Sequence, residues 1–246
     1  MTNKEKCSLS VDKDFIPDAG LGKFIEGYTT ERDILGKFSI KKQTVYIFQE
    51  GILWVTKYIF GKSEEIILRY DEMGGIRTSK ERQYQSTYGL FKKYIGTNVI
   101  LEICDKDGLS LLKRSFSYMN EKEDESMYNA LGCSMVAIQN QWSDIAIRKL
   151  NHELSEKGYG TFRTIEYGSF KNKKVTIKIG RDFLKADDNY AGSNFKYAFQ
   201  DGSLYIYPSE EDRNFSNKKE YFTININDMY DKEIFLQAAY QLLGIK

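Results

Sequence analysis

The sequence contains two groups of basic residues that could bind an anionic ligand. The first group lies in a segment rich in tyrosine and phenylalanine and consists of Lys80, Arg82, Lys92 and Lys93. The second group precedes a β-branched run and consists of Lys171, Lys173 and Lys174. Because lysine and arginine donate charge-assisted hydrogen bonds to phosphate oxygens, either group could bind a phosphorylated headgroup. The alternative, which we favour, is a pair of solvated basic loops balanced by nearby acidic residues.

The other reactive side chains do not form a catalytic or metal-binding pattern. The chain has one histidine, His152, which excludes a metal site built from several histidines. Acidic neighbours such as Asp187 and Asp188 point in different directions in a turn, whereas carboxylate catalysis needs two groups that converge on one bond. Gly61-Lys62-Ser63 matches the end of a phosphate loop, but the first glycine of that motif would fall at Thr56, inside a predicted strand. We therefore predict no catalytic residue, no cofactor and no metal.

The charge of the chain gives no overall attraction to an anionic polymer or surface. The sequence has 36 lysine and arginine residues against 35 aspartate and glutamate residues, which gives a formal net charge of +1. Basic residues among aromatic ones also suit single-stranded nucleic acid, but the balanced charge argues against that partner.

Targeting signals and cysteine spacing bear on where the protein works. The sequence has no apolar run of ~18 residues that could span a membrane, and no apolar segment follows the polar N-terminus. We therefore expect a cytoplasmic protein. The cysteines Cys7, Cys104 and Cys133 are odd in number and have no short spacing, which argues against a disulfide framework and against a zinc site.

One pattern occurs twice along the chain: a run of short strands followed by one amphipathic helix. In the first copy, β-branched and aromatic runs predict strands at 44–48, 52–58, 65–70, 76–82, 98–103 and 109–116. A helix is predicted over about 123–156, with apolar residues at helical spacing at Leu131, Met135, Ile138, Trp142 and Ile145. The pattern allows one continuous helix or a break near Gln141.

The second copy repeats the pattern with shorter segments. Strands are predicted at 162–167, 175–179, 195–199, 203–207 and 221–226. A final helix follows, capped by Asn227-Asp228 or by Asp231, and Gly244 fits the position just after its end. The sequence thus predicts an α+β, β-rich protein with a flexible tail at 1–20, a first module at 21–140, a helical connector at 141–158 and a second module at 159–246.

Several of these segments resemble a family of uncharacterised bacterial proteins with tandem pleckstrin-homology-like domains. The matching segments are Val45-Tyr46-Ile47-Phe48, Gln49-Glu50-Gly51 with Ile52-Leu53, Tyr70-Asp71-Glu72-Met73, Ile177 to Leu184, Gly202-Ser203-Leu204 and Asn227 to Leu243. Tyr70 stands where a tryptophan is usual, and this chain lacks the N-terminal transmembrane hairpin of many relatives. The resemblance implies two small barrels, each with a C-terminal capping helix, and implies no established activity.

The hypothesis that follows is a non-enzymatic binding or scaffold protein that acts through protein–protein contacts. Peripheral recognition of anionic lipid headgroups through the basic loops is the alternative. A hydrolase with an unrecognised carboxylate site is the third hypothesis, because carboxylates with perturbed pKa values leave no mark in a sequence. The sequence predicts neither the identity of the partner nor the oligomeric state.

Overall fold

The structure is a computed structural model of the chain. It describes residues 11, 16–30, 34–35, 38–39, 41–58, 61–87, 91–118, 125–167, 172–192, 194–207 and 222–245. Of these it describes the backbone alone at 30, 34–35, 38–39, 41, 80–87, 91–97, 116–118 and 125–131. The chain divides into two compact units: Met1–Gly74, Lys80–Leu101 and Leu111–Trp142 form unit 1, and Gly75–Ser79, Glu102–Ser110 and Ser143–Lys246 form unit 2.

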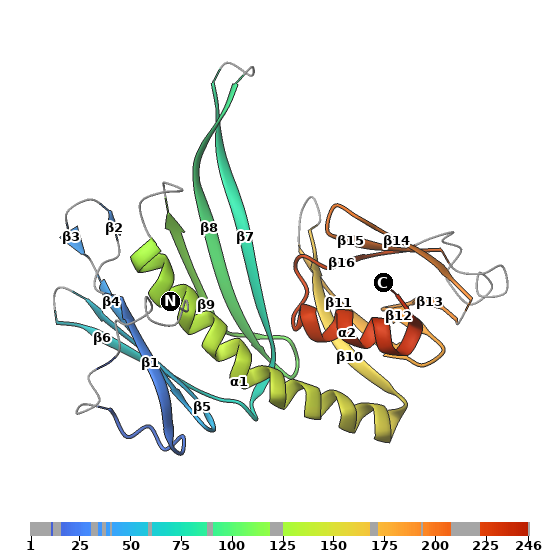
Figure 1. Cartoon of the computed structure of the whole chain (residues 1–246), viewed down its shortest axis with the longest axis horizontal. Helices are drawn as coiled ribbons and strands as arrows, with labels where there is room; N and C mark the ends of the chain where they lie inside the picture. The colour runs from blue at the N-terminus through green and yellow to red at the C-terminus, as the bar shows by residue number, and fades with distance from the viewer. Residues whose placement is uncertain are drawn as a thin grey trace, which may run out of the picture. The chain divides into compact units, whose positions relative to one another are not determined.

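The first half of the chain forms a four-stranded sheet, a three-stranded sheet and a helix, in that order (Figure 1). The antiparallel four-stranded sheet has the order β1-β4-β5-β6 and is made of β1 (Phe24–Thr30), β4 (Lys41–Phe48), β5 (Gly51–Tyr58) and β6 (Ser63–Arg69). The small pair β2 (Ile34–Leu35) and β3 (Phe38–Ser39) lies between β1 and β4 in the sequence. The three-stranded sheet has the order β7 (Met73–Thr87), β8 (Phe91–Asp105) and β9 (Ser110–Tyr118), and α1 (Glu125–Lys157) follows it.

The second half repeats this order with shorter elements. Its four-stranded sheet consists, in spatial order, of β10 (Tyr159–Glu166), β11 (Lys173–Gly180), β12 (Leu184–Ala186) and β13 (Asn189–Ala191). The three-stranded sheet consists of β14 (Lys196–Gln200), β15 (Ser203–Tyr207) and β16 (Phe222–Asn225), and α2 (Lys232–Leu243) closes the chain. The structure therefore confirms a β-rich protein of antiparallel sheets with few helices, and no sheet among the described residues closes into a barrel.

Alternation of apolar and polar residues positions the strands over the cores of the units. In β11 the residues Val175, Ile177 and Ile179 are buried and the residues between them are partly buried, as expected for a strand with one face on a core. Phe162 of β10 meets Phe235 of α2 edge to face, with 5.3 Å between the ring centroids. Helix α2 therefore packs on the sheet that contains β10 and β11.

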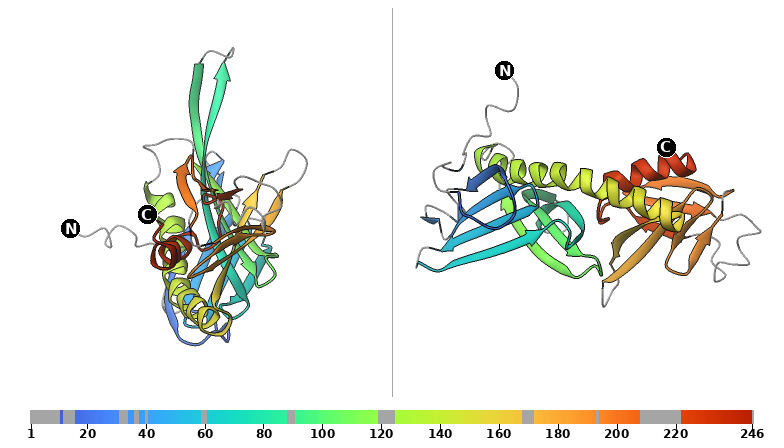
Figure 2. Two further views of the ribbon diagram at one scale, coloured as in Figure 1. Left: turned by 90° about the vertical axis from the view of Figure 1, so that its right-hand side faces the viewer. Right: turned by 90° about the horizontal axis from the view of Figure 1, so that it is seen from below.

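Helix α1 settles the alternative that the sequence left open. It runs unbroken from Glu125 to Lys157 (Figure 2), so the predicted connector at 141–158 is the second half of one helix. Met135, Ile138 and Trp142 are buried as predicted, and Ile145 is partly buried. The side chain of Leu131 lies outside the described residues.

Local turn chemistry follows the sequence closely at two places. The Asp105 carboxylate accepts hydrogen bonds from the backbone N–H groups of Asp107 and Leu109, at 2.9 and 2.7 Å, and so closes the turn between β8 and β9. Gly244 ends α2 with φ 68°, and its N–H donates to the Tyr240 carbonyl at 3.0 Å. The end of α2 at Gly244 was predicted from the sequence.

The two cysteines that the structure describes differ from each other. Cys104 is fully buried and free. Cys133 is disulfide-bonded, and its partner lies outside the described residues. The cysteine spacing argued against a disulfide framework, and Cys133 nevertheless forms a disulfide.

No helix in the described part of the chain combines the length and the apolar composition that a bilayer crossing requires.

Candidate functional site

The first predicted basic group lies on strands and not on a loop. Lys80 and Arg82 belong to β7, and Lys92 and Lys93 belong to β8. Their side chains are outside the described residues, as is all of Lys171. The first group therefore stays a prediction, and so does Lys171.

Lys173 and Lys174, at the start of β11, both have partners within unit 2. The Lys173 ammonium lies 2.6 Å from Asp187 Oδ2, and the hydrogen bond and charge of Asp187 raise the pKa of Lys173. The Asp187 carboxylate also accepts a hydrogen bond from the Thr176 N–H at 2.9 Å. This acid is therefore a turn-forming residue, as the sequence suggested for Asp187 and Asp188.

Lys174 and Arg163 hold the turn between β8 and β9. The Lys174 ammonium donates to the Gly108 carbonyl, and the Arg163 guanidinium donates to the Lys106 carbonyl. Two cations thus bind the carbonyls of Lys106 and Gly108, in a turn that lies more than fifty residues earlier in the sequence. An anion that binds Lys173 or Lys174 has to displace a carboxylate or a carbonyl already in place, or lie beside it.

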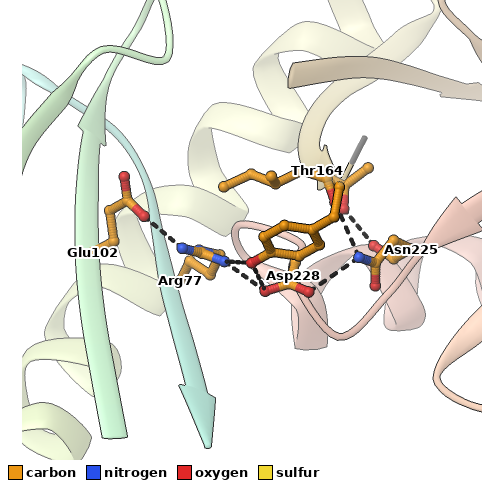
Figure 3. Close-up of polar contacts among 7 residues, drawn as sticks. Arg77, Glu102, Thr164, Asn225 and Asp228 are labelled. Carbon is orange, nitrogen blue, oxygen red and sulfur yellow. Dashed lines mark hydrogen bonds and ion pairs between the residues drawn. The ribbon is translucent and has the colours of Figure 1, made fainter. Parts of the chain in front are cut away.

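A buried polar cluster of unit 2 is centred on Arg77 of β7, which was not among the predicted site residues (Figure 3). One guanidinium nitrogen lies 2.6 Å from Glu102 Oε2 of β8. The other lies 2.5 Å from Asp228 Oδ1, in the turn before α2, and 3.2 Å from the Tyr167 hydroxyl oxygen. The Tyr167 hydroxyl donates in turn to Asp228 Oδ1 at 3.0 Å. We call these four residues the Arg77 cluster.

Burial makes the electrostatics of the Arg77 cluster strong. The side chains of Arg77, Glu102 and Asp228 are 4%, 8% and 14% exposed. Burial alone lowers the pKa of Arg77, but the hydrogen bonds and charges of Glu102 and Tyr167 outweigh it and raise that pKa above its ordinary value. Arg77 therefore stays charged, and removal of one partner would leave a charge buried without compensation.

Asparagine and threonine side chains connect the Arg77 cluster to strands β10 and β16. Asn225 of β16 donates through its amide to Asp228 Oδ2 and to the Ile165 carbonyl, each at 3.0 Å. The Thr164 hydroxyl of β10 donates to the Asn225 carbonyl. Side chains therefore join β10 to the edge of the sheet that ends in β16 (Figure 3).

Asp231, just before α2, also forms hydrogen bonds with β7 close to the Arg77 cluster. The backbone of Ile76 exchanges two bonds with this residue: its N–H donates to Asp231 Oδ1 at 3.1 Å, and its carbonyl accepts from the Asp231 N–H at 2.8 Å. Asp231 occupies the N-cap position of α2, as one of the two predicted candidates, but its side chain makes no capping bond. The acid that the sequence assigned to a helix cap therefore binds a strand instead.

This arrangement holds strands together and is unsuited to proton transfer. Both carboxylates of the Arg77 cluster already bind the guanidinium, whereas a general base needs an oxygen that can reach a substrate proton. His152 is exposed on α1. Across the described residues, no three histidine, cysteine or acidic side chains come together where they could hold a metal ion.

The sequence contained one signal for the Arg77 cluster, which lay in the strands themselves. Glu102 stands within the apolar run Ile100-Leu101-Glu102-Ile103, and Arg77 follows Ile76 in a neighbouring predicted strand. A charged residue inside an apolar strand usually has a partner of opposite charge. Asp228 is 151 residues from Arg77, so local patterns could not identify it.

No protein-family model matches the chain, and no curated protein is similar enough to count as a match.

Proposed function

We propose that this chain is a non-enzymatic binding or scaffold protein built from two pleckstrin-homology-like repeats and acting through contacts with other proteins. The observation that supports this most is the repeated order of elements. Each half of the chain has a four-stranded sheet, then a three-stranded sheet, then a helix. Small β-rich domains of this kind present strand edges and loops to partners, and function depends on those surfaces more than on the fold.

The state of the polar residues favours binding over catalysis. The carboxylates of Glu102 and Asp228 bind a buried guanidinium, which suits a structural role better than the hydrolase hypothesis. The proposal includes a cytoplasmic location. The disulfide at Cys133 argues against a reducing compartment.

Recognition of anionic headgroups is the second candidate, and the position of Lys173 favours it. Its side chain is 65% exposed at the start of β11, so a phosphate could approach it from solvent. The existing ion pair with Asp187, at 2.6 Å, weakens this candidate because an added anion would have to displace that carboxylate or lie beside it.

Affinity purification with the whole chain as bait, quantified by mass spectrometry, tests the first candidate, and vesicle flotation tests the second. We expect a protein partner to be enriched equally by the wild type and by a variant with Lys171→Ala, Lys173→Ala and Lys174→Ala. We also expect neither form to float with vesicles that contain anionic lipid.

Flotation of the wild type that falls with added salt and disappears in the triple variant would move the lipid candidate to first place. The melting temperature of the variant has to match the wild type for that conclusion. Failure to enrich any protein, together with such flotation, would refute the scaffold proposal.

A further inference from the structure

Strand β14 is an edge strand whose whole length is open to solvent. It pairs with β15 on one side and, among the described residues, with no strand on the other. All five of its residues, Lys196 to Gln200, are exposed. An edge strand of this kind offers a row of backbone N–H and C=O groups to another strand.

The sheet face that covers the core continues onto β14. Phe199 lies opposite Leu204, and Tyr197 lies opposite Ile206. Residues opposite each other on antiparallel strands point to the same face. Leu204 and Ile206 are fully buried, yet Phe199 is 44% exposed. The core face is therefore open at this edge, where an added strand would extend it.

The sequence of β14 is complementary to itself in the antiparallel direction. When two copies pair about Ala198, Lys196 of one copy lies opposite Gln200 of the second, so a cation meets an uncharged amide. Tyr197 of one copy then lies opposite Phe199 of the second, on the face that carries the core. Tyr197 and Phe199 already pack edge to face within one chain, with 6.3 Å between their ring centroids. Pairing would gather the four rings of the two copies into one cluster.

Other registers fit less well. A shift by one residue would place the core face of one copy beside the outer face of the other. A shift by two residues keeps the faces aligned but leaves part of each five-residue strand unpaired. Only the register about Ala198 pairs the whole strand and keeps both core faces on the same side.

We propose that β14 pairs with β14 of a second copy of this chain about a two-fold axis at Ala198, which joins the two β14-β15-β16 sheets into one. Such an interface is isologous, so it closes and forms a dimer, not a filament. Because each strand is short, the contact is small and the dimer is expected to be concentration-dependent. This inference goes beyond the proposed function and does not depend on it.

Cross-linking through introduced cysteines tests the register. In the proposed dimer the two Ala198 residues are directly opposite, with Cα atoms about 4.5–5.5 Å apart, which is within the range that a disulfide spans. Ala198→Cys is therefore expected to form a covalent dimer under mild oxidation. Gln200→Cys is the matched control, because the two copies of residue 200 would be about 14 Å apart along the strands. The wild type controls for the native cysteines.

Sedimentation at increasing protein concentration tests the dimer itself. Phe199→Lys places a charge in the aromatic cluster and is expected to weaken dimerisation about tenfold or more. Ile67→Lys is the control, since Ile67 is also exposed, at 49%, on the sheet edge β6 of unit 1. Melting temperatures establish that both variants are folded. A chain that stays monomeric at its highest soluble concentration, or equal cross-linking of Ala198→Cys and Gln200→Cys, overturns the proposal.

Discussion

The two halves of the chain share an order of elements and differ in the length of those elements. Strands β7 and β8 have 15 residues each, whereas the corresponding strands β14 and β15 have 5 each. Helix α1 has 33 residues and α2 has 12. The added length of the first half is used in unit 2, which contains Gly75–Ser79, Glu102–Ser110 and the helix from Ser143 onward.

The buried charges show what this difference means. Unit 2 contains the Arg77 cluster, in which Arg77 and Glu102 come from the long strands and Asp228 and Tyr167 come from the second half. The ion pairs that the structure describes in unit 1, such as Arg114 with Glu64 at 3.5 Å, are partly exposed. A repeated order of elements therefore does not make two independent modules, because the shorter half completes its core with strand ends from the longer one.

Replacement of Arg77 is expected to have the largest effect on stability. Arg77→Ala leaves Glu102 and Asp228 buried without their cation, and we expect unit 2 to lose about 3–5 kcal/mol of stability. Urea unfolding followed by circular dichroism measures the loss, and hydrogen exchange should locate it in β10 and β16. Arg114→Ala is the control in unit 1 and should cost about 1 kcal/mol or less, because its ion pair is partly solvated. Equal effects of the two changes would contradict the contrast.

Helix α1 provides a second contrast within a single element. Ile138 is fully buried and Val136, two residues before it, is 55% exposed. We expect Ile138→Ala to cost about 2–5 kcal/mol, because it leaves a cavity in a packed core, and Val136→Ala to change stability by about 0.5 kcal/mol or less. Thermal and urea unfolding measure both. Near-wild-type stability of Ile138→Ala would show that this face of α1 does not carry the core of unit 1.

The stability of unit 2 is expected to fall at alkaline pH because of Cys104. Burial raises the pKa of the Cys104 thiol to about 12. The unfolded chain then ionises first as the pH rises. The neutral thiol therefore makes its full contribution to stability below the ordinary thiol pKa of 9. That contribution is lost as the pH rises toward 12.

We expect this loss to be ~1.4 kcal/mol per pH unit in that window. Burial also raises the pKa of Tyr230 in unit 2 and of Tyr28 and Tyr70 in unit 1, so these residues act in the same direction. Unfolding titrations from pH 8 to 11 should show a shallower decline for Cys104→Ala than for the wild type. An unchanged slope would mean that the thiol ionises in the folded chain.

The smallest expected effect is at Lys173. Its ion pair with Asp187 lies at the surface, with the lysine 65% exposed. Lys173→Ala should therefore change the free energy of unfolding by about 0.5 kcal/mol or less. The melting temperature in low and high salt measures it. A loss as large as that of Arg77→Ala would show that charge at this surface matters as much as charge in the core.

Periodicity and turn chemistry determined most of the local structure. Alternation in Val175 to Ile179 predicted β11, helical spacing predicted the buried face of α1, and Gly244 marked a helix end. The three-residue strands β12 and β13 were not predicted as a pair, because segments that short carry too little periodicity to be distinguished from turns.

Tertiary structure alone decided which polar residues matter. The sequence pointed to clustered lysines, yet Lys174 binds a turn carbonyl and Lys173 a neighbouring acid. The Arg77 cluster has members 151 residues apart. The charges of Arg77, Glu102 and Asp228 are acceptable in a core only because these three side chains lie together. Local patterns indicate which face of a segment is buried, because apolar residues recur with the period of the strand or helix. They do not indicate which residue, distant in the sequence, contacts that face, because that contact depends on how the sheets pack.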